Sequence, residues 1–136
     1  MPPESTLSPV FQIASDLVDR LGALDPILAT SMGVPGHDAE MSDYSPEGQA
    51  AVAALYRSTL ANLAEVPITN DRDRMARDAM RDSLGLRIER FDAGEHLDAM
   101  YRSPVVSVRG SFDLLPRATE ADWSNIAGRL ALVPQG

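Results

Sequence analysis

The sequence predicts an all-α fold of five or six helices, with antiparallel neighbours joined by mostly short loops. A good N-cap residue stands directly before a proline at four places, and apolar residues follow each pair at spacings of three and four. No segment alternates convincingly with period two. The only local rival for a strand is residues 105–108, whose Ser-Pro start and spacing to Phe112 favour a helix.

The first two helices are predicted to begin at Ser8-Pro9 and Asp25-Pro26. Proline disfavours helical backbone in the residue before it, and its missing amide is not needed at the first helical position. Apolar side chains between residues 10 and 21 form one face, and Gly22 loosens the end of that helix. The second helix is short and is stopped by Gly33, after which residues 33–44 form a long irregular connection.

The next two helices are predicted from Ser45-Pro46 to a stop at Pro67, and from Thr69 towards Phe91. Acidic residues in the first turn of the latter complement the helix dipole. Its apolar positions start at Met75, and its outer arc carries Arg and Asp. The spacing predicts the surface pairs Asp73–Arg77 and Arg74–Asp78.

The last two helices are predicted after Ser103-Pro104 and after Thr119, which forms a capping box with Asp122. A second, less regular connection precedes them at residues 91–102. The final stripe contains Trp123, Ile126 and Leu130, and the helix ends at Pro134.

Composition excludes several classes of function. A formal charge of −8 argues against nucleic-acid binding, which needs clustered Lys and Arg. All twelve basic residues are Arg, which removes Schiff-base chemistry and phosphate-loop lysines, and the absence of Cys removes thiolate sites. Neither a secretory pattern nor the roughly 20 apolar residues of a membrane helix is visible, so we expect no membrane association and, by default, a cytoplasmic location.

The two histidines are the first candidates for chemistry. A zinc site needs three or four ligands, but neither His37 nor His96 has a second His three or four residues away, and an HExxH pattern is absent. Asp38 and Glu40 could complete a loop site with His37, although acidic residues in polar loops are usually solvated. We therefore predict no catalytic, cofactor-binding or metal-binding residue and no cofactor in this chain.

Two further groups have a functional and a simpler interpretation. The stretch from Asp71 to Arg81 could clamp a substrate, yet a solvated helix face is several times more common. Asp113, Asp122 and Trp123 could suggest a sugar site, but helix capping and one buried aromatic side chain explain them more simply.

The order of the motifs resembles a known bacterial family. The run LDPILATSMG (24–33), followed after a polar loop by DYSPE (43–47), is similar to the opening of the family called domain of unknown function 885. The run SPVVSVRGSFDLLP (103–116), leading into TEADW (119–123) and RLALVP (129–134), strengthens the match. Members are large helical proteins that resemble zinc metallopeptidases, with an HExxH helix in the distal half. No position here corresponds to the zinc ligands or the catalytic Glu of that helix.

The resemblance implies that residues 1–136 form a single helical region, an irregular and incomplete part of a larger helical protein. As the N-terminal portion of a zinc-dependent peptidase-like protein, it would form a wall of the substrate groove without catalysing a reaction. Its partners would then be the remainder of a longer chain or a second copy. The alternatives are a stand-alone helical interaction or scaffold module and, last, a small hydrolase that uses Asp/His chemistry.

Overall fold

The prediction of an all-α fold is confirmed by a computed structural model, which describes residues 7–97 and 104–135. Within these ranges the chain forms six α-helices and two short 3₁₀ turns, η1 and η2, and contains no strand. The elements are α1 (Pro9–Leu24), α2 (Pro26–Met32), α3 (Pro46–Glu65), α4 (Asp71–Asp92), η1 (Glu95–Leu97), α5 (Pro104–Leu114), α6 (Glu120–Leu132) and η2 (Val133–Gln135).

The predicted helix starts are confirmed wherever the structure describes them. The side chains of Ser8, Asp25 and Ser45 each accept a hydrogen bond from a backbone amide in the first turn of the helix that follows. Thr119 and Asp122 form the complete capping box. Ser103 lies outside the described residues, and α5 begins at Pro104.

The start of α4 differs by one residue from the prediction. Asn70, rather than Thr69, is the N-cap, because its side-chain oxygen accepts the Asp73 amide at 2.8 Å. At the other end of α2, Gly33 adopts the left-handed backbone (φ 72°) that closes this helix, as the sequence predicted.

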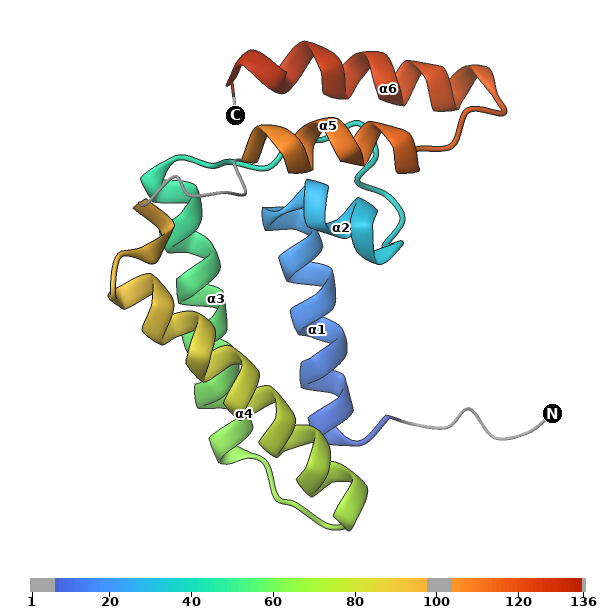
Figure 1. Cartoon of the computed structure of the whole chain (residues 1–136). Coiled ribbons are helices and arrows are strands. Elements are labelled where there is room, and N and C mark those ends of the chain that lie inside the picture. Colours follow the sequence, from blue (N-terminus) through green and yellow to red (C-terminus); the bar gives the residue numbers. More distant parts are fainter. Residues whose placement is uncertain (1–6, 98–103, 136) are drawn as a thin grey trace, which may run out of the picture.

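The helices form two groups (Figure 1). α3 and α4 run antiparallel as a hairpin, and α1 packs against both of them. α5 packs on α2. α6 runs alongside α5 on the side away from α2, and its Arg129 donates to Ser111 of α5. Buried apolar side chains occur in both groups, among them Leu63 on α3, Leu84 on α4, Ile27 on α2 and Val108 on α5.

Several side chains are placed differently from the prediction. Asp73 is only 2% exposed, so the expected surface pair with Arg77 does not form. Arg74 instead pairs with Asp71, and Arg77 pairs with Asp78. The reason is that Asp73 faces the start of α1, where the Ser8 hydroxyl donates to its carboxylate at 2.8 Å.

The outer face of α6 corrects a second prediction. Trp123 was expected to be the one buried aromatic side chain, but it is 55% exposed, and Leu130 is 61% exposed. The two residues are seven positions apart and therefore share one face of α6, and their exposure shows that the described chain leaves this face uncovered. Met75 on α4 is likewise exposed. The helical period therefore located the apolar stripes without showing which of them are covered.

None of the described helices is both long enough and apolar enough to cross a membrane.

Candidate functional site

The predicted candidates do not come together in the structure. His37 lies in the irregular connection before α3, with its Nδ1 atom 2.7 Å from Oε2 of Glu40. His96 lies in η1, and its ring stacks on Phe91 with 4.3 Å between centroids. Over residues 7–97 and 104–135, no three His, Asp or Glu side chains are grouped so that they could hold a metal ion.

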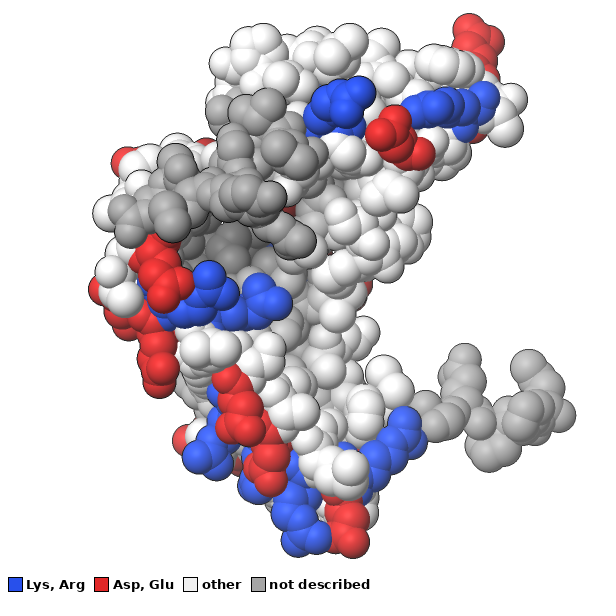
Figure 2. Space-filling model, in the orientation of Figure 1, with Lys and Arg blue, Asp and Glu red and all other residues white. Residues whose placement is uncertain are grey.

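The charged candidates have structural partners. Between residues 71 and 81, Arg and Asp side chains pair along the surface of α4, and Figure 2 shows basic and acidic side chains interspersed where this helix lies. Asp113 is 3.6 Å from Arg117, one turn further along the chain. Asp122 caps α6, and the hydrogen bonds from the Thr119 and Ala118 amides hold the pKa of its carboxyl below the ordinary value. The geometry therefore matches the simpler interpretation of these residues.

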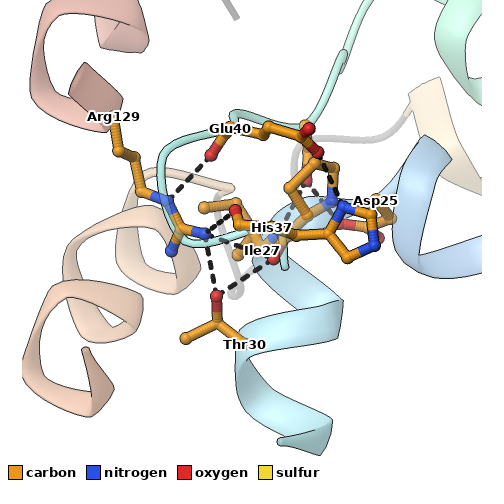
Figure 3. Close-up of polar contacts among 8 residues, drawn as sticks. Asp25, Ile27, Thr30, His37, Glu40 and Arg129 are labelled. Atoms are coloured by element: carbon orange, nitrogen blue, oxygen red, sulfur yellow. Dashed lines mark hydrogen bonds and ion pairs between the residues drawn. The ribbon is translucent and has the colours of Figure 1, made fainter. Parts of the chain in front are cut away.

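The most deeply buried ionic group is one that the sequence analysis did not select, the guanidinium of Arg129 on α6. Its side chain has no solvent exposure. It donates to the carbonyl oxygens of His37 and Glu40 and to the Thr30 hydroxyl, each at 2.8 Å, and to the Ser111 hydroxyl at 3.2 Å. Figure 3 shows the side chain reaching from α6 to the irregular connection and to α2.

This arrangement is a structural site rather than a reactive one. Burial lowers the pKa of Arg129, whereas the carboxylates of Asp38 and Glu40 oppose that shift. An arginine stays protonated in proteins, so the site keeps its positive charge. Because neutral oxygens accept its hydrogen bonds, Arg129 joins α2, α5, α6 and the 33–44 connection without a direct ion pair to any of residues 7–97 and 104–135.

The same connection is fixed at its other end by Ser42. The Ser42 hydroxyl, itself buried, donates to the Asp25 carboxylate and accepts from the Ile27 amide at 3.0 Å. Next to it, Asp43 approaches α3 so closely that a Cβ atom at Gly48 would lie 2.3 Å from the Asp43 carbonyl oxygen. Only glycine fits at that position. The result is that residues 42–44 are held against the first turns of α3.

A pocket of about 300 Å³ opens beside this segment. Four separate parts of the chain line it: the α1–α2 junction, residues 42–44, one face of α3, and the end of α4 with η1. Its walls combine apolar, aromatic and charged side chains, and those that matter below are Asp25, Tyr44, Tyr56, Arg87, Arg90 and His96. The pocket is the best candidate for a ligand-binding site in the described structure.

Two tyrosines, Tyr44 and Tyr56, contribute hydroxyl groups to the pocket lining. Burial raises the pKa of both Tyr44 and Tyr56, and the nearby Asp25 carboxylate acts in the same direction. Arg87, whose guanidinium carbon lies 5.9 Å from the Tyr56 ring centroid, opposes the shift at Tyr56. Both hydroxyls therefore remain protonated at neutral pH and can donate a hydrogen bond to a ligand.

The polar groups of the pocket are largely engaged with one another. The one histidine that lines it stacks on Phe91, and the hydroxyl of Ser42 is already engaged with Asp25 and Ile27. A serine nucleophile would need a base within hydrogen-bond reach. The described lining residues do not supply such a pair.

Comparison with protein families identifies one match. The model of a family described as "Bacterial protein of unknown function (DUF885)" matches residues 26–136. The matched segment contains α2 to α6 and every hydrogen-bond partner of Arg129. Comparison with curated proteins finds none that matches the chain.

Proposed function

The chain belongs to the bacterial DUF885 family. We propose that it is a non-catalytic helical portion of a zinc-dependent, peptidase-like protein. In this role, α3, α4 and the segment before α3 form part of the wall of a substrate groove. The zinc ligands and the catalytic Glu would come from a region of the parent protein that residues 1–136 do not include. The proposed location is the cytoplasm.

The pocket is the observation that carries this proposal. It is open to solvent and is lined by residues suited to hold a polar molecule, while the described lining residues lack a nucleophile–base pair. A groove wall needs these binding properties and leaves the reaction to other groups. Arg129 and Ser42 support this role because they fix the irregular segment that forms one side of the pocket.

The native gene product provides the first test. If the proposal is right, an antibody raised against this chain detects a protein several times heavier than 14.7 kDa in the source cells. That product should contain stoichiometric zinc and hydrolyse peptides, whereas the purified 136-residue chain should do neither. A native product of 14.7 kDa would refute the groove-wall role, and peptide hydrolysis by the isolated chain would refute the absence of catalysis.

An alternative is a stand-alone interaction or scaffold module, which the outer face of α6 favours. Trp123 and Leu130 stand two turns apart on this helix and are both more than half exposed. Exposed large apolar side chains on one helix face are typical of surfaces that contact another protein or another part of the same protein.

Self-association of the purified chain addresses that alternative. Sedimentation velocity of the wild type should show concentration-dependent association that is lost in a Trp123→Ser, Leu130→Ser double variant. Because both side chains are exposed, the double variant should keep the circular dichroism spectrum of the wild type. Association in the wild type together with a native product of 14.7 kDa would place the scaffold function ahead of the groove-wall function. If the wild type is monomeric, the exposed face of α6 is no longer evidence for a contact with a second copy or with the remainder of a longer chain.

A further inference from the structure

The acidic side chains of the pocket are already engaged by the protein. The Asp25 carboxylate caps α2 through the Leu28 amide and accepts from Ser42. Asp43 accepts from the Ser45 amide at 2.9 Å, and these bonds hold the pKa of the Asp43 carboxyl below its ordinary value. Glu95 pairs with Arg90 at 2.5 Å. Each carboxylate is therefore used in the local structure.

Three polar side chains on the α3–α4 side of the pocket, Arg87, Tyr56 and His96, are not paired with a carboxylate of the described residues. Arg87 forms no ion pair with the described residues. The ring of Tyr56 is buried beneath the guanidinium of Arg87, and the Tyr56 hydroxyl is protonated at neutral pH. The third is Nδ1 of His96, a buried atom without a hydrogen-bond partner in the described structure.

These side chains line the same pocket and are connected by contacts along one wall of it. Arg87 and Phe91 are four residues apart on α4 and therefore share a helix face. His96 stacks on Phe91, and Tyr56 lies against Arg87. A buried polar atom without a partner is unfavourable, and a ligand that reaches it can supply the missing hydrogen bond. A carboxylate offers two acceptor oxygens and matches the planar guanidinium fork.

We propose that this pocket binds a small organic carboxylate, with its anionic group held by Arg87, Tyr56 and His96 and its apolar part against Val52 and Ala53. The net charge of −8 opposes the approach of an anion, so the recognition depends on these local donors. This site goes beyond the groove-wall role and does not depend on it.

Binding can be measured on the purified chain by NMR titration of backbone amides. The probes are benzoate and hippurate, each with its neutral amide, benzamide or hippuramide, as a matched control. Both acids should bind saturably with shifts at residues 52–56 and 87–96, and the amides should bind at least ten-fold more weakly, since a hydrogen bond to a charged group contributes about 1.5–3 kcal/mol. Hippurate adds one peptide unit. Tighter binding by hippurate than by benzoate supports the carboxyl end of a peptide as the source, and equal binding supports a free small acid.

Three variants locate the contacts. Arg87→Gln should weaken benzoate binding by about ten- to a hundred-fold, whereas Arg81→Gln, on a different part of the same helix, should leave it unchanged. His96→Phe keeps the stacking on Phe91 and should weaken binding by about two- to ten-fold. Circular dichroism confirms that each variant is folded, which is expected because Arg87 and Arg81 are exposed.

The proposal is overturned by any of three results: equal affinity for an acid and its amide, equal losses in Arg87→Gln and Arg81→Gln, or no saturable binding at about 10 mM acid. None of these results bears on the mass or zinc content of the native product, so this test and that of the groove-wall role can fail separately.

Discussion

Replacing Arg129 by Met should be among the most damaging single changes in the chain. Met keeps an unbranched side chain of similar length but removes every donor from a site with no solvent exposure. The carbonyl oxygens of His37 and Glu40 and the hydroxyls of Thr30 and Ser111 then lose a partner. The substitution also removes the cation that joins four parts of the fold.

The magnitude follows from the geometry. Three of the hydrogen bonds are 2.8 Å long, and bonds to a charged group each contribute about 1.5–3 kcal/mol. The desolvation of the guanidinium offsets this by several kcal/mol. The two hydroxyls also keep other bonds, since Thr30 donates to Pro26 at 3.1 Å and Ser111 donates to Val108 at 2.7 Å. We expect a net loss of about 2–4 kcal/mol in the free energy of unfolding, a large fraction of the 5–15 kcal/mol typical of a domain.

Urea unfolding followed by circular dichroism at 222 nm measures this loss, with Arg109→Met as the control because Arg109 is exposed on α5. Hydrogen exchange should show reduced protection in residues 33–44 and 120–132, with α3 and α4 nearly unchanged. A loss below about 0.5 kcal/mol, or one equal to that of the control, would refute the assigned role, since surface substitutions are usually within that range.

Four further outcomes are expected. Asp73→Ala should lower the free energy of unfolding by about 1–3 kcal/mol in urea, because it removes the buried carboxylate that accepts hydrogen bonds from the Ser8 and Asn70 side chains. A loss no larger than that of the exposed Asp78→Ala would contradict this. The pKa of Asp122 is below its ordinary value of 3.8, so its contribution to stability is complete above pH 3.8 and is lost as the pH falls through the folded-state pKa. An acid titration of helicity should therefore show a step that is absent in Asp122→Asn. The pKa of Tyr56 is raised above 10.0, so its contribution is present below pH 10 and is lost as the pH rises through the folded-state pKa. The late step in absorbance at 295 nm, to which Tyr44 also contributes, should lose amplitude in Tyr56→Phe. Zinc should bind no more tightly than at nonspecific surface sites, and stoichiometric zinc that survives dialysis and is lost in His37→Ala would disprove this.

The helix starts were predictable because their cause is local. Ser8, Asp25, Ser45 and Thr119 each bond to an amide three residues later, so the relevant chemistry lies within one turn of sequence. The end of α2 at Gly33 was predictable for the same reason. The one-residue difference at the start of α4 arose because two adjacent residues, Thr69 and Asn70, can both act as N-caps.

The buried charges and the pocket were not predictable in this way. Asp73 and its partner Ser8 are 65 residues apart, and the Arg129 guanidinium reaches the Glu40 carbonyl 89 residues earlier. In the sequence, Arg129 is the one charged residue in the otherwise apolar run from Ile126 to Leu132. A charged residue within such a stripe is the signal that could have marked it. The exposure of Trp123 could not be predicted, because helical periodicity does not say which face has a neighbour.

The contacts of Arg129 also affect the order in which the chain can fold. α3 and α4 are joined by only residues 66–70, so their hairpin can form as soon as both helices have left the ribosome. The connection at residues 33–44 is made earlier, but it lacks its buried cation until α6 has been synthesised. Closing contacts over such long separations costs more chain entropy than closing a hairpin. α2 and the connection after it therefore reach their final conformation only after α6 has been synthesised.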